Sequence, residues 1–179
     1  MEPLLHYILP LTALILLGEK PKTAAILATL GVASDIDALL LIHRSLSHSL
    51  LVIGLIYTPL FVYSWLRKPE LQRTFILAFL VSASHPILDL GGLTPILWPI
   101  IQHSLSLQLS LNGVMQEGLS FRPSININQS PTDFTRFTGF DYPLFTQDGL
   151  LTATILLLPV IYNQLNKRKK WTHTPSHNN

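Results

Sequence analysis

Two short sets of ionisable residues interrupt apolar stretches of this chain. Asp35 and Asp37 lie in one such stretch, and His85 and Asp89 lie in another. An ionisable side chain at the depth of a membrane costs several kcal/mol unless it faces a cavity, pairs with another group or binds an ion. Imidazole and carboxylate groups together are ligands that divalent transition metals accept. These residue types therefore predict a metal site.

The spacing within each set predicts which residues bind. His85 and Asp89 are four residues apart, so on a helix both side chains project from one face and can bind one ion or two adjacent ions. Asp35 and Asp37 are two apart, which directs them to opposite sides of a helix, so at most one of them should bind directly. We favour Asp35 as the ligand, with Asp37 as an alternate ligand or a supporting group.

Further candidates lie near the N-terminus and in the segment 43–48. His43 and His48 are five apart and should not share a helical face; His48 opens the next apolar stretch and is the better ligand. We expect His43 and Arg44 to bind substrate. His6 is a weaker candidate, because a lone histidine in a helix bundle is more often a hydrogen-bonding partner. The predicted metal ligands are His6, Asp35, His48, His85 and Asp89.

The ligand set also indicates the metal and the chemistry. The chain contains no cysteine, which excludes thiolate sites and disulfides. Imidazole and carboxylate ligands suit zinc, with manganese or iron as alternatives. A bound divalent ion lowers the pKa of a water ligand and polarises the oxygen of the scissile group, so the site predicts a hydrolase that uses metal-activated water. Asp37, or Asp35 if it is not a ligand, would be the general base.

The composition places these residues in a membrane protein. Of 179 residues, 48% are hydrophobic and only 12% are charged, and the mean hydropathy is +0.38. Apolar windows of roughly 18 residues predict five membrane-spanning helices, at 3–18, 23–42, 49–66, 74–90 and 149–165. The predicted fold class is an all-α polytopic membrane protein, a bundle of about five transmembrane helices with a small external β-hairpin.

The basic residues predict the orientation of these spans. If the five spans alternate, one side of the membrane receives nine of the twelve Lys and Arg residues, at positions 20, 22, 67, 68, 73 and 167–170. The positive-inside rule then places the N-terminus outside the cell membrane and the C-terminus in the cytoplasm. All five predicted ligands fall near the outer face, although they were not used to derive the orientation.

The spans divide the chain into four parts. Residues 1–103 form a four-helix core that carries the metal site, and residues 148–166 form the final span. Between them, 104–147 form an external segment in which alternating leucines and Asn112-Gly113 predict a hairpin and its turn, and 122–147 predict an interfacial loop. We expect the leucine face to lie on the bilayer or on the helices. Residues 167–179 form a basic tail that contacts anionic lipid.

Several motifs resemble those of a known family. The run Asp35-Ile36-Asp37, the segment His43–Ser49, and His85-Pro86-Ile87-Leu88-Asp89 with a trailing Leu97-Trp98-Pro99 are similar to motifs of the YdjM-like (LexA-regulated) family of membrane-bound, metal-dependent hydrolases. The similarity covers residues 1–101. It implies a metal-dependent hydrolytic activity at the membrane.

The order of these residues is more distantly similar to that in zinc-dependent phospholipase C and the related single-strand nucleases. This resemblance implies that Asp35, His48 and His85 hold one ion. It further implies that His6 and Asp89 hold a second ion, with Asp89 shared between the two.

This chain lacks the ligands that hold a third ion in those soluble enzymes. In those soluble enzymes an N-terminal Trp amine and a later His with a carboxylate complete a three-ion site. This chain begins Met1-Glu2-Pro3, and it offers only His103 between the motifs and the last span. We therefore expect one or two ions.

The position of the site predicts its substrate class. A metal centre near the outer leaflet would meet phospholipids or other lipid-linked phosphoesters, so membrane lipids are the expected partners and nucleic acid is not expected. The sequence does not indicate an oligomeric state. Two other classes remain open: a metal-ion or proton transporter, and a non-catalytic bundle whose buried polar residues only join helices. A transport path needs polar groups at several depths, whereas the inner halves of the spans are almost purely apolar.

Overall fold

The computed structural model describes residues 2–42, 44–115, 119–139 and 143–172. The α-helices are α1 (Pro3–Leu16), α2 (Pro21–Ala28), α3 (Leu30–Ala33), α4 (Leu50–Arg67), α5 (Gln72–Leu88) and α6 (Gln147–Thr172). Short 3-10 helices are η1 (Ser34–Leu40), η2 (Leu46–His48), η3 (Pro69–Leu71) and η4 (Asp89–Gly91). Strands β1 (His103–Met115) and β2 (Leu119–Pro131) form an antiparallel ribbon. The prediction of a mainly helical chain with a small two-stranded sheet is confirmed.

Proline and glycine set the helix boundaries. Pro3 and Pro21 occupy the first turns of α1 and α2, where a missing N–H costs nothing. Gly18 follows α1 with a φ of +91°, and the amide of Glu19 bonds back to the carbonyl of Leu14 at 3.0 Å. This left-handed glycine ends α1 and turns the chain into α2.

Four segments within the described residues are long and apolar enough to cross a membrane: Pro21–Leu40, Leu50–Arg67, Pro69–Gly91 and Gln147–Leu165. The prediction of five spans is wrong for the first, because α1 has 14 residues. At a rise of 1.5 Å per residue it is about 21 Å long, against about 30 Å for the hydrocarbon core of a bilayer. Helix α6 also continues to Thr172, so the predicted basic tail begins within a helix.

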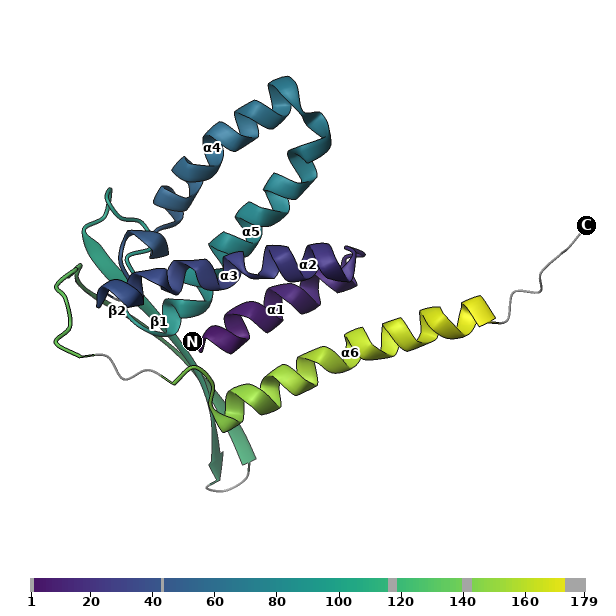
Figure 1. The fold of residues 1–179 in the computed structure, drawn as a ribbon. Coiled ribbons are helices and arrows are strands. Elements are labelled where there is room, and N and C mark those ends of the chain that lie inside the picture. The colour runs from purple at the N-terminus through teal and green to yellow at the C-terminus, as the bar shows by residue number, and fades with distance from the viewer. Residues whose placement is uncertain (1, 43, 116–118, 140–142, 173–179) are drawn as a thin grey trace, which may run out of the picture.

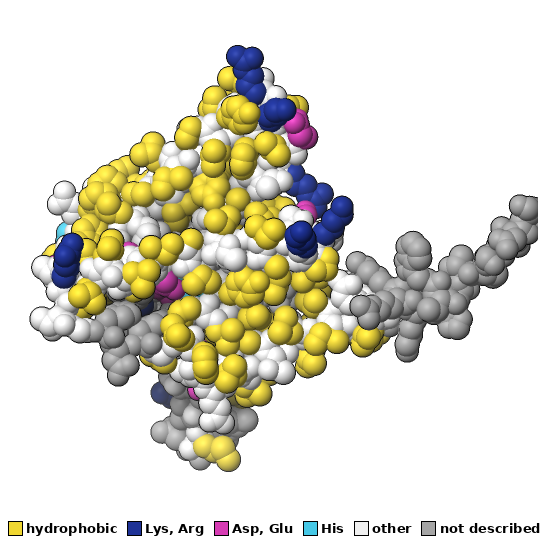
Figure 2. Space-filling view, in the orientation of Figure 1, with side chains coloured by type: hydrophobic (Ala, Val, Ile, Leu, Met, Phe, Trp, Pro, Cys, Tyr) yellow, Lys and Arg dark blue, Asp and Glu magenta, His cyan; other side chains and the backbone are white. Residues whose placement is uncertain are grey.

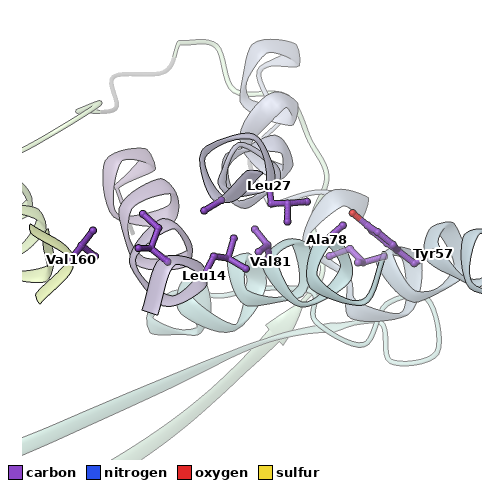
Figure 3. Close-up of a cluster of buried hydrophobic side chains, with 9 residues drawn as sticks. Leu14, Leu27, Tyr57, Ala78, Val81 and Val160 are labelled. Atoms are coloured by element: carbon purple, nitrogen blue, oxygen red, sulfur yellow. The ribbon is translucent and has the colours of Figure 1, made fainter. Parts of the chain in front are cut away.

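The helices pack side by side, with the ribbon across one end (Figure 1). Helices α4 and α5 form an antiparallel pair, and α1 lies between α6 and the α2–α3 segment. Buried side chains from these helices meet in one core, which Figure 3 shows: Leu14, Leu27, Tyr57, Ala78, Val81 and Val160. The one polar tip among them is satisfied, because the hydroxyl of Tyr57 is 2.9 Å from that of Ser82.

The outer surface of the helices is largely hydrophobic (Figure 2). Large apolar side chains such as Leu55 and Trp65 are about three-quarters exposed, at 73% and 75%. Lysine and arginine side chains gather at the α1–α2 and α4–α5 turns. Such a surface suits contact with lipid rather than water.

The ribbon differs from the predicted hairpin in length and turn. Asn112 pairs with Arg122 and Gly113 with Phe121, so Asn112-Gly113 lies inside β1 and is not the turn; residues 116–118, which link the two strands, lie outside the described residues. The predicted loop at 122–147 is also wrong in its first part, where β2 runs to Pro131. Apolar side chains alternate in β2 as in β1, and pairing them on one face extends the ribbon beyond the Asn-Gly pair.

The two faces of the ribbon have different surroundings. Leu107 lies opposite Ile127 and Leu109 opposite Ile125, and all four side chains are exposed. On the other face Ser104 and Ser106 are buried. The leucine face therefore points away from the helices, and the serine face lies against the chain near η4.

A close contact between α1 and α3 holds the N-terminal helix in place. A Cβ at Gly31 would overlap the carbonyl oxygen of His6 and press on Pro10 at 3.2 Å. Small residues at helix crossings allow backbones to approach in this way.

We expect Gly31→Ala to lower the free energy of unfolding by about 1–3 kcal/mol, because the overlap forces the two backbones apart. Gly54 in α4 is the matched control: a Cβ there meets no atom within 4 Å. Gly54→Ala should be neutral or raise stability by up to about 1 kcal/mol. Thermal unfolding in detergent measures both; equal melting temperatures for the two variants would contradict the proposed contact.

Candidate metal centre

Four of the five predicted ligands converge in one cluster. Asp35, His48, His85 and Asp89 each offer one ligand atom, and these four atoms all lie within 4.8 Å of one another. The Nε2 of His85 is 3.0 Å from the Nε2 of His48 and 3.3 Å from the Oδ1 of Asp35. The Oδ2 of Asp89 is 3.6 Å from the Nε2 of His48. The cluster could bind a metal ion.

These separations are close to those of a tetrahedral site. Ligand atoms about 2.0–2.2 Å from a zinc ion lie about 3.3–3.6 Å apart along the edges of a tetrahedron. His48 and Asp35 are 3.9 Å apart, His85 and Asp89 are 4.0 Å apart, and no pair in the cluster exceeds 4.8 Å. A modest contraction of the cluster would bring these atoms to the edge lengths that zinc requires.

Irregular helix ends bring these residues together. The segment 21–40 changes from α-helix to 3-10 helix at Ser34, and Asp35 lies in that tighter turn. His48 is the last residue of η2, just before Ser49 caps α4 by accepting a bond from the Val52 amide. His85 lies in the last turn of α5, and Asp89 begins η4. Both lie on the same side of the helix end, as a four-residue spacing predicts.

A backbone carbonyl fixes the ring of His85. Its Nδ1 donates to the carbonyl oxygen of Gly31 at 2.5 Å, so the lone pair of Nε2 faces the cluster. Outer hydrogen bonds of this kind orient the histidine ligands of metal sites. The same glycine that allows α1 to approach α3 therefore also positions a predicted ligand on α5.

Asp37 and a serine hold the ring of His48 from the outside. The Nδ1 of His48 lies 3.3 Å from the Oδ2 of Asp37 and 3.2 Å from the hydroxyl of Ser47. Asp37 in turn accepts bonds from the amide of Ser45 at 2.8 Å and the hydroxyl of Ser47 at 2.9 Å. Asp35 and Asp37 thus approach opposite nitrogens of one imidazole, and Asp37 supports His48 from outside the four-atom cluster.

At His48 a proton competes with a metal ion for the imidazole nitrogen. Burial alone would lower the pKa of His48, but its contacts with Asp37 and Asp89 outweigh burial and raise that pKa above its usual value. The Nε2 of His85 is an acceptor, so the Nε2 of His48 at 3.0 Å either donates a proton to it or shares a cation with it. Binding of a metal displaces that proton.

His6 joins the cluster through Asp89. Its Nε2 lies 3.1 Å from the Oδ1 of Asp89, whose Oδ2 belongs to the four-atom cluster. The His6 ring stacks on His85 with centroids 3.9 Å apart, and its buried Nδ1 has no hydrogen-bond partner among the described residues. A carboxylate with one oxygen toward each of two sites is the arrangement that a bridging ligand requires.

Arg44 lies at the edge of the cluster. Its Nε is 3.6 Å from the Oδ2 of Asp89, its Nη1 donates to the carbonyl of Leu93 at 3.5 Å, and its side chain is 26% exposed. The guanidinium lies against Gly92, where a Cβ would overlap it. Arg44 has a φ of 60°, an uncommon left-handed conformation for a residue with a side chain. Strained backbone of this kind is concentrated at functional sites.

Other histidine and arginine residues are not part of the described cluster. His43 falls outside the described residues. His103 begins β1 and is exposed, as are Arg122 in β2 and Arg136 in the loop that follows it. None of these three belongs to the cluster of described residues.

Three supporting groups were not predicted. They are the carbonyl of Gly31, the Ser45–Ser47 turn around Asp37, and Thr94, whose hydroxyl donates to the backbone carbonyl of Asp89 at 2.9 Å. Thr94 also pairs with Leu105 in β1, which ties the ribbon to the cluster. A glycine in an apolar helix and serines flanking a histidine are weak signals, since each is common without such a role.

Comparison of the chain with protein-family models, curated proteins and solved structures gives no match. The resemblance to the YdjM-like family therefore stays a prediction. The cluster itself rests on the geometry of the described residues.

Removing a central carboxylate should remove the metal. We expect purified protein to carry about one or two divalent ions per chain, and Asp89→Asn, which keeps the shape of the side chain, to carry less than about a tenth of that. His103→Ala is the control, because His103 is exposed and outside the cluster. Elemental analysis of the detergent-purified proteins measures the content; full occupancy in Asp89→Asn would contradict the site.

Asp37→Asn should weaken metal binding without abolishing it. The amide of Asn can still contact His48, but it lacks the negative charge that favours a proton on the Nδ1 of His48. We therefore expect the affinity of the cluster for zinc to fall about 10–100-fold. Competition with a chelating zinc indicator measures this change. An affinity equal to that of the native protein would show that Asp37 does not support His48.

Proposed function

We propose that this chain is a membrane-bound, metal-dependent hydrolase of the YdjM-like family that acts on lipid-linked phosphoesters. One observation carries the proposal: two imidazoles and two carboxylates from separate elements converge at one end of a bundle of membrane-length apolar helices. A divalent cation bound there supplies Lewis-acid activation of water and of a phosphoryl oxygen. Zinc fits the ligand set best, with manganese or iron as alternatives.

Arg44 is the proposed phosphate-binding residue. Its partly exposed guanidinium sits beside Asp89 at the rim of the cluster, and arginine recognises phosphate through several donors at once. Gly92 leaves the space that this side chain occupies. His43, adjacent in sequence, remains a predicted substrate-binding residue outside the described part of the chain.

Asp35 is the proposed general base. Its Oδ1 belongs to the cluster, whereas its buried Oδ2 has no hydrogen-bond partner among the described residues and can accept a proton. In the proposed step the oxygen of water bonds to phosphorus while one of its protons passes to Asp35. The phosphorus–oxygen bond to the alcohol then breaks, and Asp35 returns that proton to the alcohol oxygen as it leaves. The contacts of Asp37 with His48 favour a positioning role for Asp37 over the role of base.

The surroundings of the cluster favour this proposal over the alternatives. A transporter needs polar groups along its path, but the core beyond the cluster is built from residues such as Leu14, Leu27 and Val81. A purely structural bundle does not need two carboxylates and three fully buried histidines in mutual contact. The proposed orientation follows from the same picture: the basic α1–α2 and α4–α5 turns lie at the opposite helix ends and face the cytoplasm.

Turnover of phospholipids by the purified protein tests the proposal. We expect release of phosphate or a phosphorylated headgroup from phosphatidic acid or phosphatidylglycerol in mixed micelles with zinc or manganese. Arg44→Gln should lower kcat/KM about 10–100-fold, because one charge-assisted contact to phosphate is lost. Arg136→Gln is the matched control, since Arg136 is exposed and away from the cluster. A lack of turnover with each lipid and metal would contradict the proposal.

A further inference from the structure

We propose that the groove between α1 and α5 holds the hydrocarbon chain of the lipid phosphoester, with its polar group at the metal cluster. The groove has a volume of about 150 Å³. Its lining residues are Leu9, Pro10, Ala13, Leu14, Leu17, Leu77, Leu80, Val81 and Ser84. This inference rests on the proposed function for the identity of the polar group, whereas the groove itself does not depend on it.

Each wall of the groove is one face of a helix that carries a histidine of the site. On α1 the lining residues follow His6 at three, four, seven, eight and eleven positions, the spacing of one helical face. On α5 they precede His85 at one, four, five and eight positions. Because α1 and α5 run in opposite directions, both histidines lie at the same end of the groove, where their rings stack at 3.9 Å.

The end of the groove at Pro10 and Ser84 is the end nearer the cluster. Pro10 borders the groove and lies beside the α-carbon of Gly31, whose carbonyl holds His85. Ser84, the only polar side chain in the lining, is next to His85 in the chain. A ligand in the groove would therefore extend along an apolar channel towards the histidine–carboxylate cluster.

The chemistry and size of the groove select a hydrocarbon chain. Its floor includes the buried Leu14 and Val81, and its rims include Leu17 and Leu80, which are 68% and 55% exposed. From Leu9 to Leu17 the groove is about 12 Å long. The groove volume of about 150 Å³ is well below the several hundred Å³ that one turn of a partner helix occupies. Its apolar lining also offers almost no hydrogen-bond partner for water or a sugar.

A photoactivatable lipid tests the occupant without requiring activity. We would illuminate the purified full-length protein with phosphatidic acid that carries a diazirine in one acyl chain and map the labelled peptides by mass spectrometry. Labels should concentrate on α1 and on the second half of α5. Leu80→Trp should reduce them about fivefold or more by filling the groove. Leu55→Trp, at a position 73% exposed on α4, is the matched control and should leave the labelling unchanged.

The pattern of labels decides the outcome. Equal labelling of all exposed apolar helices, or labelling of α1 and α5 that survives Leu80→Trp, would show that only bulk lipid contacts this surface and would overturn the proposal. Ala13→Trp, which fills the groove from α1, guards against a folding defect peculiar to the first variant.

Kinetics separate this inference from the proposed function. Leu80→Trp should lower kcat/KM for a long-chain phosphoester about tenfold or more, while a short-chain, water-soluble phosphoester should be hydrolysed within about twofold of the native rate. An equal loss on both substrates would overturn the groove. If the native protein hydrolyses neither, the proposed activity fails, and the labelling result still decides whether the groove holds a lipid chain.

Discussion

The structure depends on pairing buried histidine and aspartate side chains with one another and with backbone groups in apolar surroundings. His6, His48, His85 and Asp89 have almost no exposed surface, although each can carry a charge. Leaving such groups unpaired would cost more than most single contacts in a protein contribute. Each is therefore held by a neighbour from another element: His6 and Asp89 by each other, His48 by Asp37, and His85 by the carbonyl of Gly31. The arrangement of the helix ends follows from this need.

Irregular backbone places side chains of the cluster where regular α-helices could not. A continuous α-helix over 21–40 would rotate Asp35 and Asp37 away from a common neighbour, whereas the 3-10 turn of η1 places both beside His48. Leu41 and Arg44 then adopt left-handed backbone conformations, with φ of 58° and 60°. The cost of this strain, about 1–3 kcal/mol for each residue, is offset by the contacts that it makes possible.

Polarity changes steeply from one end of the molecule to the other. Basic turns lie at one end, a hydrophobic core and lipid-compatible surface lie between, and the histidine–carboxylate cluster lies at the other end beneath the amphipathic ribbon. A lipid phosphoester has the same polarity, with an apolar chain joined to an anionic group. The proposed substrate therefore matches the apolar groove and the cluster at its end.

The sequence alone determined the apolar segments and the residue types of the cluster, because these depend on composition and on local spacing. It wrongly predicted that α1 spans the membrane and that the ribbon turns at Asn112-Gly113. Both errors arise because packing sets the length of a helix and the register of a strand pair, and local sequence patterns do not contain that information. Only the tertiary structure decided which groups meet. Gly31 and His85 are 54 residues apart, and His6 and Asp89 are 83 apart. No periodicity in the chain encodes such contacts, since they arise when separate helices bury their apolar faces together.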